Sequence, residues 1–131
     1  TLLMIAMAGG HEGLAKALLQ RGADVSLHTS TAATALLGAA LNGREKMVEL
    51  ALRHGAEVDE KDSNGITALM GAAGKGHEKV VDSLIRHGAA IDHQCNNGNT
   101  ALIRAAIRGH PAALLCLLRA GADVTLCSAD G

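Results

Sequence analysis

Aromatic side chains are absent from this sequence, and proline is almost absent. The 131 residues include no Phe, Tyr or Trp, and Pro111 is the single proline. Any hydrophobic core must therefore be built from Leu, Ile, Val, Met and Ala. The lack also counts against an aromatic hot spot for binding on this chain. Either a partner supplies the aromatic anchors or the contact is broad.

Strong net charge, a disulfide framework and long apolar runs are missing as well. The net charge is −1, and no basic stripe runs along the chain, so we expect no nucleic-acid partner. The three cysteines, Cys95, Cys116 and Cys127, are odd in number and irregularly spaced, and no signal peptide is recognisable. These features predict an intracellular, cytoplasmic protein, with the nucleus as the alternative. Apolar stretches shorter than ~18 residues predict no direct membrane insertion.

The stretch GAAGKG, residues 71–76, looks like a phosphate-binding loop but lacks the required spacing. A Walker A loop needs a glycine five positions before Gly74, where Leu69 stands, and a hydroxyl after Lys75, where Gly76 stands. The dinucleotide pattern fails too, since His77, Glu78 and Lys79 follow Gly76. We therefore expect no cofactor here.

The chain instead repeats itself every 33 residues. One column of the repeat holds threonine, and three others hold alanine or glycine. The columns are Thr1, Thr34, Thr67 and Thr100; Ala6, Ala39, Ala72 and Ala105; Gly10, Gly43, Gly76 and Gly109; and Gly22, Gly55, Gly88 and Gly121. Four such columns in register indicate an internal repeat rather than chance.

Each repeat unit carries the signals of two short helices. Thr67 is placed to cap a helix over about 68–75, and Gly76 to end it. A second, amphipathic helix is predicted over about 78–87, with Gly88 as its left-handed stop. Turn residues such as those at 62–65 and 96–98 separate the units.

This pattern resembles the ankyrin repeat. The motif T-P-L-H-x-A is approximated by residues 67–72, Gly-His pairs precede second helices at 76–77 and 109–110, and Gly-Ala-Asp-Val follows them at 22–25 and 121–124. The motif's proline and histidine are replaced throughout by apolar residues. The resemblance implies an all-α solenoid of about four stacked helix pairs with projecting β-turn loops.

We expect a single array over residues 1–131, with units at about 1–28, 29–61, 62–94 and 95–127, and a further unit starting at 128–131. Neither end has a polar capping repeat, so the array is predicted to be a fragment of a longer one. The turn at 30–33 lacks the glycine of the others, and we expect it to be the least regular. Gly71 is matched by Gly38 but also by Ile5 and Arg104, so no glycine is required in that column.

The residues that could support catalysis or metal binding fall into repeat columns. His11, His77 and His110 precede second helices, and His54 and His87 follow them, which favours structural roles over catalysis. His93 and Cys95 form the best metal-like pair, but no second pair accompanies them. Cys95 and Cys127 belong to successive units that stack roughly 10 Å apart, too far for an unstrained disulfide. We expect no catalytic residue, cofactor or metal.

By resemblance, the concave face of the stack should bind a protein or peptide. It is formed by the first helices of the units and the turns, and solenoids typically bind through such surfaces. The predicted contact residues are Leu41, Asn42, Ile66, Lys75, Asn97, Asn99, Arg104, Ile107 and Arg108. A second candidate surface is Leu115, whose counterparts Lys16, Glu49 and Asp82 are charged and expected to face outward.

Two functions fit these expectations. The first is a non-enzymatic adaptor, scaffold or structural subunit that binds protein, as part of a larger complex. The alternative is a regulatory or targeting segment of a larger enzyme or channel whose functional domain lies outside this chain. Flanking sequence would decide between the two, since a fold alone does not define a function.

Overall fold

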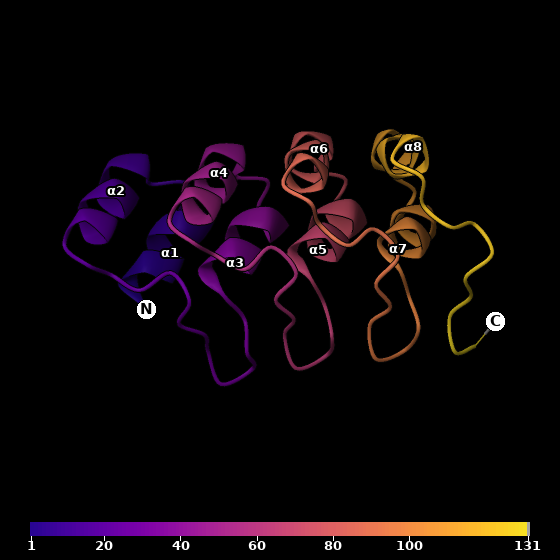
Figure 1. Ribbon diagram of the computed structural model, residues 1–131, viewed down its shortest axis with the longest axis horizontal. Coiled ribbons are helices and arrows are strands. Elements are labelled where there is room, and N and C mark those ends of the chain that lie inside the picture. The colour runs from indigo at the N-terminus through magenta and orange to yellow at the C-terminus, as the bar shows by residue number, and fades with distance from the viewer. Residues whose placement is uncertain (131) are drawn as a thin grey trace.

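The computed structural model describes residues 1–130, and within them the chain forms eight short helices and no extended strand. The helices alternate between two layers, so that each consecutive pair is an antiparallel hairpin (Figure 1). The inner layer holds α1 (Leu2–Gly9), α3 (Ala35–Leu41), α5 (Ala68–Lys75) and α7 (Ala101–Arg108). The outer layer holds α2 (Glu12–Gln20), α4 (Glu45–Arg53), α6 (Glu78–Arg86) and α8 (Pro111–Arg119).

Threonine and glycine set the ends of the inner helices. The hydroxyl oxygen of Thr67 accepts a hydrogen bond from the backbone N–H of Met70 at 3.3 Å, which satisfies one of the free donors of the first turn. The threonines at positions 1, 34 and 100 do the same. Gly76 ends α5 at φ +76°, a left-handed conformation that glycine adopts without strain. The predicted helices are confirmed to within a residue.

The hydrophobic core is built from aliphatic, methionine and alanine side chains together with Cys95, and Thr67, Ser83 and Thr100 are buried as well. Met7, Leu36, Leu69, Leu84 and Leu117 are all almost fully buried. Ala6, Ala39, Ala72 and Ala105, one residue in each inner helix, are 0% exposed. Because alanine adds little bulk, neighbouring inner helices can pack closely along this column.

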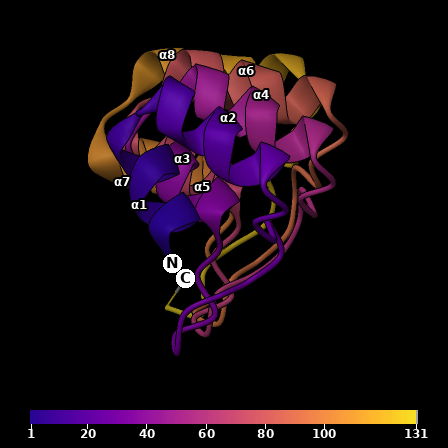
Figure 2. The same cartoon turned by 90° about the vertical axis from the view of Figure 1, so that its left-hand side faces the viewer.

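The loops that connect the helix pairs project together from one side of the stack (Figures 1 and 2). Backbone hydrogen bonds join each loop to the next. The N–H of Ser63 donates to the carbonyl of Thr31 at 2.9 Å, that of Asn96 to Asn64 at 3.0 Å, and that of Ala129 to Asn97 at 2.7 Å. The described part of 128–131 thus continues this ladder. The unit boundaries stay a prediction, because a repeat can be divided at any point of its period.

The turn at 30–33 differs from the next loop less than expected: Ala32 is its positive-φ residue in place of glycine and a His28–Thr34 bridge flanks it, but its hydrogen bonds are the same. Thr29 N–H donates to Ala33 O at 2.9 Å, as Asp62 N–H does to Ile66 O at 3.0 Å in the next loop. The hydroxyl of Thr29 accepts from the N–H of Ala33, replacing the Asp62 carboxylate in the equivalent bond to Ile66. Ala32 takes the left-handed conformation, φ +59°, that Gly65 has at φ +78°. The backbone is therefore conserved while the residues differ.

Candidate partner-binding face

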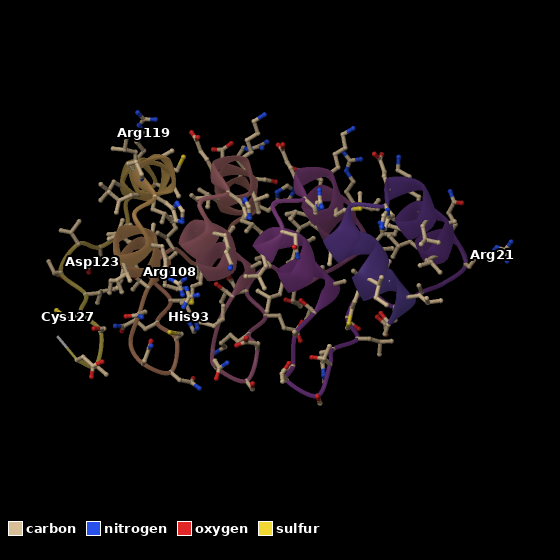
Figure 3. All side chains as sticks on the ribbon, turned by 180° about the vertical axis from the view of Figure 1, so that it is seen from behind. Arg21, His93, Arg108, Arg119, Asp123 and Cys127 are labelled. Atoms are coloured by element: carbon tan, nitrogen blue, oxygen red, sulfur yellow. The ribbon has the colours of Figure 1, made fainter. Side chains whose placement is uncertain are left out.

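The inner helices and the loops below them form one continuous surface, which we call the inner face. It corresponds to the concave face expected from the sequence. In Figure 3 Arg108 lies at the level of the inner helices, above the loops, whereas Arg119 projects from the outer layer on the opposite side. A ligand on the inner face would therefore contact α3, α5, α7 and the loops without touching the outer helices.

The three candidates at the ends of α3 and α5, Leu41, Asn42 and Lys75, differ in how accessible their side chains are to a partner. Leu41 is half-buried, and a Cβ placed on Gly71 would lie only 3.0 Å from its Cδ2. The Leu41 side chain thus occupies the space that a side chain at Gly71 would need. Asn42 is exposed, but its amide donates to the Gly38 carbonyl at 2.8 Å and caps its own helix. Lys75 is exposed and forms no salt bridge to the described residues.

Leu41 lies close to Gly71, where we expect no glycine to be required, and that expectation stays a prediction. Two columns of the repeat meet between successive units. One column holds Ile5, Gly38, Gly71 and Arg104, and the other holds Ala8, Leu41, Gly74 and Ile107. A residue of the first column lies against the residue of the second column in the preceding unit. The contacts join a small residue with a small one or a large residue with a glycine: Gly38 on Ala8, Gly71 on Leu41, and Arg104 on Gly74. Glycine at 71 is thus favoured by the neighbouring unit, which comparison within one column cannot show.

Three candidates on α7 share one face of that helix. Arg104 reaches back to α5, where its Nε donates to the Met70 carbonyl at 3.3 Å, and it covers Gly74. Ile107 is 66% exposed, and Arg108 is exposed. Residues three and four apart lie side by side on a helix. The face thus presents an aliphatic side chain next to two guanidinium groups.

The loop candidates are less accessible than the sequence suggested. Ile66 is half-buried and packs against the core. The Asn97 side chain is tied into its turn, where its Oδ1 accepts from the Asn99 N–H at 3.2 Å and from the Cys95 thiol at 2.8 Å. The Asn99 Oδ1 is buried and has no hydrogen-bond partner among residues 1–130. Of the three, only Asn97 has an exposed side chain.

A groove of about 370 Å³ opens between two successive loops on this side of the molecule. It is lined by Asn64, Ile66, Cys95, Asn96, Asn97 and Arg104. Side-chain amides and a guanidinium group beside an aliphatic wall can hydrogen-bond the backbone of an extended peptide while contacting its side chains. The sequence reasoning missed that Cys95 and Arg104 meet in one groove, since the two lie on different elements and in different repeat columns.

The histidines before the second helices have structural roles. The Nε2 of His77 donates to the Leu41 carbonyl at 2.9 Å, and its ring lies over Gly43 of the preceding unit. His110 lies over Gly76 in the same way. These contacts tie successive units together, which supports the structural interpretation of this column.

The remaining histidines also bond to the backbone. His54 and His87 each donate from Nδ1 to the carbonyl four residues earlier, at 2.9 and 2.8 Å, and that carbonyl also accepts from the histidine's own backbone N–H at the helix end. His93 lies 3.3 Å from the Gly65 carbonyl. No group of three or more His, Cys, Asp or Glu side chains within residues 1–130 is arranged to hold a metal ion.

The alternative surface on the outer layer is centred on the apolar Leu115, but the residues in the equivalent positions of the other units are charged. Leu115 is 48% exposed, and Lys16 and Asp82 are exposed in the equivalent positions. Glu49 instead turns toward α6, where its Oε1 accepts from the buried Ser83 hydroxyl. The description of Glu49 as outward-facing is therefore wrong. The helices within residues 1–130 have neither the length nor the apolar character to cross a membrane.

Comparison with protein families explains this architecture. The family model described as ankyrin repeats (3 copies) matches residues 1–62 and 36–126. The chain belongs to the ankyrin-repeat family. Ankyrin repeats are generally protein–protein interaction modules and typically have no catalytic activity. No curated protein matches this ankyrin-repeat chain closely enough to identify a relative.

Proposed function

We propose that this chain is a non-enzymatic protein–protein interaction module, an adaptor, scaffold or structural subunit, that binds a protein or peptide through its inner face. The observation that carries the proposal is the groove between the loops, bordered by Arg104 and adjoining the exposed face of α7. It combines hydrogen-bonding groups with aliphatic surface, and both lie on elements fixed by packing.

The rigidity of the inner face supports this function. Inner helices stack through the alanine column, the histidines tie units together, and backbone hydrogen bonds join the loops. A surface held in this way loses little conformational freedom when a partner binds, and this improves affinity for a given contact area. The chain has no aromatic residue to act as a binding hot spot. Affinity must therefore come from a broad contact area or from aromatic residues of the partner.

The alternative is a regulatory or targeting segment of a larger enzyme or channel. It would use the same face but would bind another part of its own protein. We place the chain inside the cell, in the cytoplasm or alternatively the nucleus. The odd number and irregular spacing of Cys95, Cys116 and Cys127 support a reducing compartment.

Capture of partners from cell lysate tests the choice of face. The wild-type chain would be compared with the variant Ile107→Asp/Arg108→Glu on the inner face and with Leu115→Asp on the outer layer. All three side chains are exposed, so the variants should fold, which circular dichroism would verify. We expect the inner-face variant to lose partners that Leu115→Asp retains. Retention of every partner by the inner-face variant would rule out the proposed face.

A further inference from the structure

Charge is separated between the two layers of the molecule. The sequence has 13 Asp and Glu residues, and all of them lie on the outer helices, in the loops or after α8. The inner helices contain no carboxylate, and their only charged residues are Lys75, Arg104 and Arg108. In a chain with a net charge of −1, the charged residues of the inner helices are therefore all cationic and lie on α5 and α7, whereas the loops below them carry carboxylates such as Asp62 and Asp92.

These three cations are unpaired, in contrast to several on the outer helices. There, Glu12 lies 2.7 Å from Lys16 and 3.7 Å from Lys46, and Arg86 lies 3.1 Å from Asp82. The hydrogen bond and charge of Lys16, with the charge of Lys46, lower the pKa of Glu12. No carboxylate in residues 1–130 forms such a pair with Lys75, Arg104 or Arg108. The inner-face cations are therefore free to pair with carboxylates of another molecule.

The Arg104 guanidinium lies against α5 because its side chain crosses between the two helices. Its side chain extends from α7 to α5 and lies over Gly74, the residue next to Lys75. Arg108 follows one turn later on α7, and Ile107 lies on the same face. Only the Nε of Arg104 has a hydrogen-bond partner among the described residues, so its two terminal amino groups remain able to bind a carboxylate in a bidentate manner.

Peptide chemistry fits this face better than nucleic-acid chemistry. Nucleic-acid binding requires many phosphate contacts, and single strands also need aromatic stacking. Here the inner helices offer only three cations, and the sequence has no aromatic residue for stacking. The amide-lined groove next to Arg104 offers hydrogen bonds to a peptide backbone instead.

We propose that the inner face binds an acidic segment of a protein partner, in which Asp or Glu side chains flank an aliphatic residue. One carboxylate pairs with Arg104 and Lys75, another pairs with Arg108, and the aliphatic side chain contacts Ile107. The backbone of the segment enters the groove lined by Asn64, Asn96 and Asn97. This inference rests on the proposed function and adds the chemistry of the partner.

Selection from a random peptide library tests the chemistry. The immobilised wild-type chain is the bait, and the affinities of enriched peptides are then measured for wild type, for Lys75→Glu/Arg108→Glu, and for Lys79→Glu/Arg119→Glu. The last variant is a matched control, because it removes two exposed cations from the outer helices and changes the net charge equally. We expect enriched peptides to be rich in Asp and Glu, to bind the inner-face variant at least about tenfold more weakly, and to bind the control within about twofold of wild type.

Other outcomes would overturn the proposal in distinguishable ways. Enriched peptides without excess acid, lost on Ile107→Asp/Arg108→Glu, would reject the acidic segment but retain the binding face. If acidic peptides lost equal affinity for both charge variants, the specific role of the inner-face cations would be rejected. A single-stranded DNA oligonucleotide of matched charge that binds as tightly as the peptides would assign the face to polyanions in general. No enrichment at all would reject the acidic segment, while lysate capture would still decide the proposed function.

Discussion

At the scale of single residues, Ala32 takes a left-handed backbone conformation, and the residue with this conformation in the next two loops is glycine. Its φ of +59° matches the left-handed Gly65 and Gly98. A Cβ in this conformation costs roughly 1–2 kcal/mol, more than the extra unfolded-state entropy of glycine, roughly 0.4–1 kcal/mol. We therefore expect Ala32→Gly to raise the free energy of unfolding by about 0.5–1 kcal/mol in urea titrations.

Ala33→Gly is the control for this prediction. Ala33 has no positive φ, so glycine there only adds freedom to the unfolded chain and should lower stability. If both substitutions destabilised the protein alike, the strain at Ala32 would be refuted.

Asn99 is a second residue whose environment predicts a gain in stability. Its Oδ1 is buried without a hydrogen-bond partner among residues 1–130, whereas Ile66 in the equivalent position packs on the core. A buried unsatisfied acceptor costs about 1–3 kcal/mol. Asn99→Ile should therefore raise the midpoint of thermal unfolding, whereas Asn97→Ile should lower it, because the Asn97 side chain supports its turn. A lower midpoint for Asn99→Ile would contradict this account.

At the scale of the helices, Gly43 after the inner helix α3 serves a different purpose from Gly55 after the outer helix α4. Gly43 and Gly55 both have positive φ, +67° and +89°. A Cβ on Gly43 would lie 2.6 Å from the Nδ1 of His77, but a Cβ on Gly55 would meet nothing within 4 Å. Both alanine substitutions introduce backbone strain, while only Gly43→Ala also displaces the ring that bonds to Leu41.

We expect Gly43→Ala to destabilise the protein by about 1 kcal/mol or more beyond Gly55→Ala, which is the typical contribution of a hydrogen bond. Urea unfolding of the two variants measures the difference. Equal losses would show that His77 adapts freely and does not tie the units together.

The helices could be predicted from sequence because their signals are local. Thr67 caps and Gly76 stops a helix through contacts within a few residues, and the period multiplies that evidence. The turn at 30–33 keeps more of the common loop structure than its residues suggest, because the Thr29 hydroxyl accepts the hydrogen bond that the Asp62 carboxylate accepts in the next loop. The reach of Arg104 over Gly74 could not be predicted, since it depends on packing between columns of adjacent units. The contact residues themselves stay a prediction.

At the scale of the whole molecule, stability should vary along the stack. Each inner unit packs on two neighbours, whereas in this chain the first and last units pack on one. Leu2 and Ile5 in α1 are 68% and 67% exposed, and Val124 after α8 is 71% exposed. In a repeat array, stability is approximately a sum over neighbouring interfaces.

Native-state hydrogen exchange should therefore show slower exchange for amides of α3–α6 than for those of α1, α2, α7 and α8. Uniform protection across the eight helices would indicate a single cooperative unit and contradict this description.

The central claim is that partners bind the inner face over α5, α7 and the loops next to them. The most direct test is to map the perturbed backbone amide NMR signals when a partner captured from lysate, or a peptide selected from the library, is added to the protein. We predict changes concentrated at residues 63–66, 74–76, 95–99 and 104–108. Changes concentrated on α4, α6 and α8 instead, around Leu115, would contradict the account.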